Sequence, residues 1–308
     1  MRVMVTGACG FVGSALCSTL SSKAIPHTRT SRKPAMPDVV VVGELDGKTD
    51  WTQALQHCTI VVHLAARVHV MRDDALDNGL AYQRTNVEGT LRLARQAAAA
   101  GVHRFIFISS IKVNGERTTR GRPFRANDIP DPRDAYGLSK NEAERGLRQL
   151  AEQTGMQVVI IRPPLVYGPG VGANFAALLG AVRRGVPLPL GAIQNRRSLV
   201  ALDNLVDLIM VCLTHPAAAN QTFLVSDGQE ISTPDLVRAI ARAMGVRTRL
   251  PTVPLWALQT IASLLGKREV MCRLSDSLEV DITATRKALG WAPPLSLEEG
   301  LRRAVVRR

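Results

Sequence analysis

Tyr136 and Lys140 are the two side chains whose type and spacing point most directly to chemistry. They stand four positions apart, and residues i and i+4 lie one above the other on the same face of a helix. An ammonium group beside a phenol favours the phenolate, so we expect Lys140 to lower the pKa of Tyr136. A phenol tuned in this way can exchange a proton with an alcohol or a ketone near neutral pH. The pair therefore predicts an acid–base couple, which needs an electron carrier beside it.

Three glycines near the start of the chain could hold such a carrier. Gly7, Gly10 and Gly13 separate a β-branched run from a helical pattern. The first glycine permits a tight turn, the second lets the backbone approach a pyrophosphate, and the third lets the helix pack closely on the strand. The free N–H groups of the new helix then face the phosphates. We predict an NAD(P) site formed by Gly7, Gly10, Phe11, Val12 and Gly13.

The residues that follow the second strand help to distinguish NAD from NADP. An acid there accepts from the ribose 2′-hydroxyl of NAD, whereas an arginine accommodates the 2′-phosphate of NADP. No acid occurs between Ser14 and Met36, where Arg29, Arg32 and Lys33 are found instead. This favours NADP(H) slightly over NAD(H), with Arg32 as the candidate phosphate ligand. The alternative is that these residues are exposed loop charges.

The elements that must position these residues alternate along the first half of the chain. Apolar or β-branched runs predict strands at Val3–Thr6, Val39–Val42, Ile60–Leu64, Phe105–Ser109 and Val158–Ile161, with a weaker strand near Ile25–Arg29. Helical patterns between them cover Val12–Ser21, Trp51–Gln56, Asn78–Ala100 and Arg133–Thr154. Such alternation predicts an α/β fold, a Rossmann-like doubly wound parallel sheet with helices on both faces.

The character of the chain changes after Pro163. Glycine and proline cluster over residues 163–172, a helix is expected from about Asn174, and Thr222–Val225 reads as a late strand. A second helix should begin after Ser232, which is a favoured capping residue. We predict an NAD(P)-binding domain over residues 1–165. Residues 166–308 are then mainly a smaller C-terminal substrate-binding lobe, interleaved with the end of the sheet at about 198–228.

The amino-acid composition limits the kinds of ligand and partner that we expect for this protein. The net charge is +13 and the pI about 10.3, so anionic ligands are favoured. Aromatic residues make up only 4% and no basic run is interleaved with them, which argues against nucleic acid. The five cysteines form no C-x-x-C pair, which indicates a reducing, cytoplasmic location. The scattered histidines predict no metal site.

One apolar segment raises the question of membrane insertion. Val253–Leu265 is too short to span a bilayer, so we expect a packed helix and no stable membrane insertion. Lys267 and Arg268 follow it directly and leave contact with a membrane surface open.

The chain resembles the extended short-chain dehydrogenase/reductase family, in its nucleotide-sugar epimerase, dehydratase and reductase branch. The resemblance covers nearly the whole length. It rests on the order and spacing of Thr6-Gly7-x-x-Gly10-Phe11-x-Gly13, Glu44-Leu45-Asp46, His63-Leu64-Ala65-Ala66, Asn86-Val87-Glu88-Gly89-Thr90, Phe107-Ile108-Ser109-Ser110, Tyr136-x-x-x-Lys140, Arg162-Pro163-x-x-Val166-Tyr167-Gly168-Pro169 and Leu289-Gly290-Trp291.

The resemblance implies roles for the cofactor side of the site. Leu45 and Asp46 would contact the adenine. Ala65 and Ala66 would line the path of the pyrophosphate and the nicotinamide ribose. Asn86 would be buried behind the active site, and the chain at Pro163 would wrap the nicotinamide.

It also implies roles on the substrate side. Tyr136 would be the catalytic acid–base, with Lys140 bonding the nicotinamide ribose and lowering the pKa of the phenol. Ser110 would bond the reacting sugar oxygen, with Ser109 as the alternative. Asn174 and Arg197 match positions that bind the diphosphate and base of a sugar nucleotide. Asn174 could instead cap a helix, and Arg197 could be a solvated charge.

These roles imply hydride exchange at carbon 4 of a UDP-sugar. We expect reduction rather than epimerisation, because the end of the second strand is basic and Leu165 stands where epimerases of the family tend to carry Asn. The resemblance to bacterial enzymes of surface-polysaccharide synthesis implies a UDP-4-keto-6-deoxy-N-acetylhexosamine as the substrate. The alternative is a UDP-sugar 4-epimerase acting on UDP-glucose or UDP-GlcNAc, and a remote one is a non-catalytic NAD(P)-binding regulator. Ile111 and Lys112 replace the acid pair of dehydratases, which disfavours dehydration. Family members commonly form homodimers through the two long helices, here Asn78–Ala100 and Arg133–Thr154.

Overall fold

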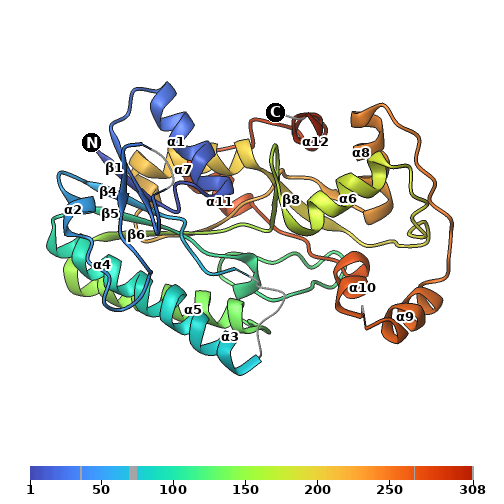
Figure 1. The fold of residues 1–308 in the computed structure, drawn as a ribbon, viewed down its shortest axis with the longest axis horizontal. Coiled ribbons are helices and arrows are strands. Elements are labelled where there is room, and N and C mark those ends of the chain that lie inside the picture. The colour runs from blue at the N-terminus through green and yellow to red at the C-terminus, as the bar shows by residue number, and fades with distance from the viewer. Residues whose placement is uncertain (35–36, 69–74, 267, 307–308) are drawn as a thin grey trace.

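The computed structural model describes residues 1–34, 37–68, 75–266 and 268–306, and its centre is a seven-stranded sheet (Figure 1). The strand order is β3-β2-β1-β4-β5-β6-β9 and every pairing is parallel. The strands are β1 Val3–Thr6, β2 His27–Ser31, β3 Val39–Val41, β4 Ile60–His63, β5 Arg104–Ile108, β6 Gln157–Arg162 and β9 Thr222–Leu224. All residues of β1, β4 and β5 are buried, as in sheets covered on both faces. The predicted Rossmann-like fold is confirmed.

Helices cover both faces of this sheet (Figure 1). One face packs on α1 Phe11–Ser22, α7 Leu202–Thr214 and α11 Thr283–Leu289. The other packs on α2 Thr52–Leu55, α4 Thr90–Ala99 and α5 Ala135–Thr154. Each face buries its own apolar cluster, so the carboxyl edge of the sheet is held rigidly between two packed layers.

The helix expected over Asn78–Ala100 is not one regular helix. The structure has α3 Ala75–Tyr82, then a π-helical segment Gln83–Gly89, and then α4. A π-helical turn inserts an extra residue into the helical register, which helical periodicity alone does not reveal. The weak strand expected near Ile25–Arg29 also begins two residues later, as β2.

The C-terminal half contributes to both parts of the molecule. β7 Leu165–Tyr167, β8 Arg197–Ala201 and β10 Glu230–Ile231 form a second, three-stranded sheet. Packed with it are α6 Ala173–Arg183, α8 Thr233–Met244, α9 Leu255–Leu264, α10 Arg268–Ser275 and α12 Leu297–Val305, which share a third apolar cluster. Meanwhile α7 and β9 return to the large sheet. The helix expected after Ser232 is present, and the Ser232 hydroxyl caps it by accepting from Asp235 N.

Candidate active site

The turn between β1 and α1 has the geometry of a phosphate cradle. Gly7 has φ +65°, and its carbonyl accepts from Gly10 N at 2.9 Å. A Cβ on Gly13 would lie 2.1 Å from Gly7 O, so only glycine fits there. No side chain caps the start of α1, which leaves its first N–H groups for an anion. The residues present therefore fit the pyrophosphate of NAD or NADP.

A buried hydrogen-bond chain fixes the neighbouring turn after β4. The Thr6 hydroxyl accepts from Leu64 N and Ala65 N, each at 3.1 Å, and lies 2.7 Å from His63 Nδ1. Because both backbone donors point at Thr6, its own proton goes to His63 Nδ1, and His63 Nε2–H donates to Thr90 Oγ1 at 2.9 Å. Burial lowers the pKa of His63 to about 3, so the ring stays neutral. Ala65 is thereby held against Gly7, where its N is 3.0 Å from the position of a Gly7 Cβ.

The residues predicted to contact the adenosine half of the cofactor are paired with other side chains of the protein, which the sequence did not indicate. Asp46 accepts from Arg84 Nη2 at 2.7 Å and from Lys48 N at 2.9 Å, and the first of these contacts is the main cause of its lowered pKa. Arg32, proposed for a 2′-phosphate, lies 3.7 Å from the Glu44 carboxylate, and both are about two-thirds exposed. An acid that follows β3 therefore partly neutralises the basic cluster after β2, which weakens the preference for NADP.

Tyr136 and Lys140 do share a face of α5, but the electrostatics differ from expectation. Lys140 Nζ donates to Ile108 O at 2.9 Å and lies 4.5 Å from the centroid of the Phe107 ring. It is 5.9 Å from the Tyr136 ring centroid. Burial lowers the pKa of Lys140 to about 7, partly opposed by the charge of Glu144.

The predicted lowering of the Tyr136 pKa is wrong for this arrangement of side chains. Burial raises the pKa of the phenol, and the charge of Asp134 and the neighbouring Tyr82 raise it further. The Tyr82 ring stands edge-on to Tyr136, with centroids 6.0 Å apart. Lys140 does not offset these effects, because it is directed to the end of β5 and is only about half protonated at pH 7.

The two serines after β5 have different surroundings. Ser109 is 3% exposed and its hydroxyl donates to Glu144 Oε1 at 2.6 Å. Ser110 is partly exposed, and its Oγ accepts from Lys112 N at 3.2 Å, which leaves its proton for another acceptor. Ser110 is therefore the better candidate for a substrate contact, whereas Ser109 ties β5 to α5.

A buried ion pair lies one turn beyond Lys140. Arg162 Nη2 and Nε donate to the two oxygens of Glu144 at 2.6 and 2.9 Å. Arg148 Nη2 adds a third contact at 2.8 Å, and Arg162 Nη1 donates to Asn114 Oδ1. This cluster was not predicted from the sequence, although the i, i+4 row that starts at Tyr136 and Lys140 continues to Glu144 and Arg148.

Asn86 is buried, as the resemblance implied, and it locks three segments together. Its Oδ1 accepts from Arg67 N at 2.8 Å, and its Nδ2 donates to Arg67 O and to Ser139 Oγ. Ser139 Oγ in turn donates to Tyr136 O at 2.8 Å. The π-helical segment thus places an amide that ties the residues after β4 to the first turn of α5, and so orients Tyr136.

Three further predicted residues, Pro163, Asn174 and Arg197, lie where the chain leaves the large sheet or within the second lobe. Pro163 is buried and its carbonyl accepts from Ile111 N at 3.0 Å. Asn174 is exposed in the first turn of α6, where Gly172 rather than Asn174 occupies the capping position. Arg196 pairs with Glu230 and Glu279, whereas Arg197 Nη1 donates to the carbonyls of Arg273 and Asp276. Arg197 is thus the arginine better suited to a diphosphate.

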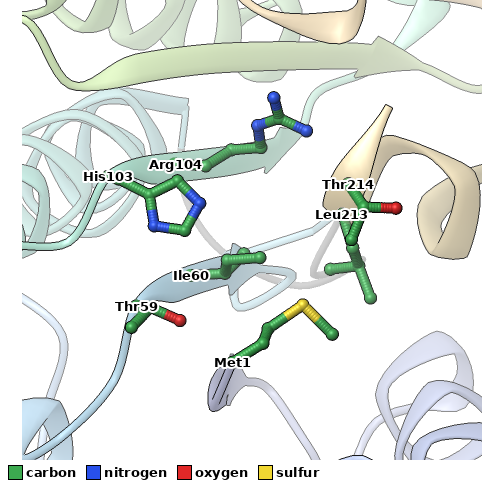
Figure 2. Close-up of a pocket in the computed structure, with 7 residues that line it drawn as sticks. All are labelled: Met1, Thr59, Ile60, His103, Arg104, Leu213 and Thr214. Atoms are coloured by element: carbon green, nitrogen blue, oxygen red, sulfur yellow. The ribbon is translucent and has the colours of Figure 1, made fainter. Parts of the chain in front are cut away.

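A surface depression of about 360 Å³ lies at the opposite edge of the sheet. Figure 2 shows its lining residues, Met1, Thr59, Ile60, His103, Arg104, Leu213 and Thr214. Ile60 and Arg104 begin β4 and β5, so the depression is at the amino ends of the strands. Arg104 donates to Gln157 and to the carbonyls of Cys212 and His215, which fastens the end of α7. These contacts give Arg104 a structural role.

The glycine cradle at the first strand, together with a Tyr–Lys pair at the carboxyl ends of β5 and β6, defines a nucleotide-dependent oxidoreductase with an open α/β sheet. The chain belongs to the NAD dependent epimerase/dehydratase family, whose model matches residues 3–226. It is an NAD(P)-dependent enzyme of the extended short-chain dehydrogenase/reductase type, so the resemblance seen in the sequence is confirmed.

Relatives agree with this assignment. A UDP-glucose 4-epimerase from Vibrio cholerae is 48% identical over 305 residues, covering 97% of this chain and 93% of the relative. An N-acetyl-alpha-D-glucosaminyl-diphospho-ditrans,octacis-undecaprenol 4-epimerase from Escherichia coli O157:H7 is 26% identical and covers 99% of this chain and 94% of its own length. Among solved structures, MoeE5 in complex with UDP-glucose and NAD gives a TM-score of 0.79 at 25% identity, covering 99% of this chain and 97% of that one.

Proposed function

We propose that this enzyme interconverts UDP-hexoses that differ in configuration at carbon 4. The observation that carries this is the 48% identity, over almost the full length of both chains, to a UDP-glucose 4-epimerase. The reduction of a 4-keto sugar, which the sequence led us to expect first, becomes the second candidate.

The protein's own residues would divide the proton chemistry as follows. When bound in the glycine cradle, the nicotinamide would supply the hydride acceptor and donor for carbon 4. Tyr136 exchanges the proton of the sugar O4, and Ser110 donates a hydrogen bond to the same oxygen. With a raised pKa the phenol is protonated at neutral pH, which suits the step in which O4 regains its proton. The opposite step needs the phenolate, which the positive charge of a bound oxidised nicotinamide would favour.

The nucleotide half of the substrate would be held by the second lobe. Arg197 begins β8 and its guanidinium reaches the C-terminal end of α10, and a guanidinium there offers several donors to a diphosphate. Asn174 on α6 is exposed and can add an amide contact. Together they would fix the sugar so that carbon 4 faces Tyr136.

Two features favour the second candidate, the 4-keto reduction. Arg32 would suit NADPH as a stoichiometric reductant, although Glu44 lies beside it. Leu165, which is 42% exposed on β7, stands where epimerases of the family tend to carry Asn. A UDP-4-keto-6-deoxy-N-acetylhexosamine would then be the substrate.

One set of incubations separates the candidates. The enzyme is given UDP-glucose or UDP-GlcNAc without added reductant, and separately UDP-4-keto-6-deoxy-N-acetylhexosamine with NADPH or NADH. We expect UDP-galactose or UDP-GalNAc to form in the first arm, with no net change in nicotinamide absorbance. Conversion confined to the second arm, with loss of NADPH absorbance, would overturn the epimerase proposal and establish the reductase.

A further inference from the structure

A group of exposed apolar side chains lies on α9 and on the residue that follows it. Trp256 is 71% exposed, Ile261 52%, Leu264 82% and Leu265 65%. Only Leu258 of this helix is fully buried, with Ala262 one turn later packed against the same cluster. Trp256 and Leu264 therefore point away from the buried side of the helix, whereas Ile261 lies on the flank next to Leu258. We define these exposed residues, Trp256, Ile261, Leu264 and Leu265, as the α9 patch.

The charges around the patch are almost all positive. Residues 250–266 contain no charged side chain, whereas residues 247–249 and 267–273 contribute Arg247, Arg249, Lys267, Arg268 and Arg273 against the single acid Glu269. The side chains of Arg247, Arg249 and Arg268 are exposed; Lys267 lies outside the described residues. The whole chain carries a net charge of +13. An apolar helix face with a basic border is complementary to an anionic lipid surface.

The position of α9 makes it available to a flat surface. Figure 1 shows α9 and α10 at the periphery of the second lobe, far from the helices that cover the large sheet. α9 packs against α10, and it is preceded by an extended segment tied to the lobe through Gly191 N to Pro251 O and Leu188 N to Arg249 O. Within the described ranges, no helix is long and apolar enough to cross a bilayer. If α9 contacts a membrane, the arrangement that fits is a helix lying parallel to the membrane surface.

We propose that the α9 patch attaches this enzyme to anionic membrane surfaces. A second copy of the chain is a poorer occupant, because one ten-residue helix offers well under the roughly 800 Å² per partner that a stable dimer buries. An interfacial Trp and exposed leucines next to arginines are the residue types that bilayer interfaces favour.

Attachment there would also place the substrate site near the lipid. The carbonyls at the end of α10 that accept from Arg197 belong to the element on which α9 packs. Membrane attachment itself needs no substrate, so it can be tested independently of the proposed reaction.

The experiment uses Trp256 as its reporter. The other two tryptophans, Trp51 and Trp291, are 0% and 5% exposed, so a change in emission on adding lipid reports mainly Trp256. The full chain is mixed with vesicles of phosphatidylcholine alone, or of phosphatidylcholine and phosphatidylglycerol in equal amounts. We expect a blue shift of the emission and co-sedimentation with the anionic vesicles only, both weakened by salt.

Matched variants make the result specific. Leu264→Glu should weaken vesicle binding roughly tenfold or more, because it removes buried leucine area and adds a charge repelled by the lipid. Ile129→Glu, at a site 88% exposed and outside α9, should bind as the unaltered protein does. Since Leu264 is so exposed, both variants should keep the unaltered thermal unfolding. Equal binding by both variants, absence of binding to anionic vesicles, or a patch-dependent dimer in place of lipid binding would overturn the proposal.

Discussion

The side chains of Tyr136 and Lys140 do not form the direct charge pair that their spacing suggests. Lys140 bonds to the end of β5 and lies under Phe107, and Tyr136 is crowded by Tyr82 and Asp134. The phenol is therefore a neutral donor at pH 7. Positive charge on a bound oxidised nicotinamide would assist its ionisation.

Removing the phenolic oxygen tests whether Tyr136 moves the proton. We expect Tyr136→Phe to lower kcat by about 10²- to 10⁴-fold, the usual contribution of a general acid–base, while NAD binding is largely kept. Turnover of the UDP-sugar is measured together with protection by NAD of Cys9, the exposed cysteine beside the glycine cradle, against alkylation. Tyr82→Phe is the control, and it should lose far less activity. Full activity in Tyr136→Phe would favour a non-catalytic role for the pair.

The buried Lys140 should make the stability of the fold depend on pH. Its pKa is lowered from 10.5 to about 7 by burial, so between these values the unfolded chain holds a proton that the folded chain has released. The free energy of unfolding should therefore rise with pH, by about 2 kcal/mol from about pH 7 to about pH 9. Urea unfolding at both pH values measures this rise, which Lys140→Met should abolish. Lys48→Met, an exposed lysine, should retain it; an unchanged rise in Lys140→Met would contradict the assignment.

At the element scale, helix α5 and the strands beside it hold the site through a buried ion pair. Glu144 accepts from Arg162, Arg148 and Ser109, and these contacts, led by that of Arg162, outweigh burial and hold the pKa of Glu144 below its usual value of 4.5. β5, β6 and α5 are thus joined behind Lys140. The cluster explains why the carboxyl ends of β5 and β6 keep a fixed distance from Tyr136.

Glu144→Gln should destabilise the fold by about 3–5 kcal/mol, since it leaves the buried Arg162 without its counter-charge. Urea unfolding near neutral pH measures this. Because the folded-state pKa is lowered, the contribution is complete above pH 4.5 and is lost as the pH falls below it. The difference between the two proteins should therefore shrink in acid.

Glu152→Gln is the matched control on the same helix. Glu152 is exposed, and the same substitution there should change stability by no more than about 0.5 kcal/mol. If the two variants were equally stable, the cluster would not be what joins α5 to the sheet.

The sequence predicted the elements well and their electrostatics poorly, for physical reasons. Fully apolar runs identify β4 and β5 almost to the residue, and the glycines identify the cradle, because local sterics allow few alternatives there. The π-helical segment around Asn86 was missed, since its extra residue is stabilised by tertiary hydrogen bonds to Arg67 and Ser139. Likewise the partner of Arg32 is Glu44, from the loop that follows β3, and no local pattern reveals such a pair.

In the molecule as a whole, the chain passes repeatedly between its two parts. β7 begins the second lobe, α7 and β9 then return to the large sheet, and α11 returns to it again after α10. Asp227, which follows β9, accepts from Tyr167 OH at 2.7 Å and from Asn204 Nδ2 at 2.7 Å, and so ties β7 to α7. The two parts are therefore connected by buried polar contacts as well as by chain, which suits a site whose cofactor and substrate halves must stay aligned.

A homodimer is predicted to form through α5 and the helices that pack beside it. Leu80 on α3 is 72% exposed and Leu138 on α5 is 55% exposed, and the two helices pack together. Exposed leucines on adjacent helices are typical of a surface that is covered by a partner. This face is distinct from the α9 patch, so dimerisation and lipid attachment can coexist.

Leu138→Glu tests the dimer directly. A charge on each copy of a two-fold interface is brought close to its own equivalent or to apolar surface, so we expect the variant to be monomeric where the unaltered protein is dimeric. Light scattering over a range of concentrations measures the mass. Ile129→Glu, an equally drastic change at an exposed position outside these helices, should leave the mass unchanged. A dimer that persists in Leu138→Glu would place the interface on another face, and a monomeric unaltered protein would mean that Leu80 and Leu138 are simply solvated.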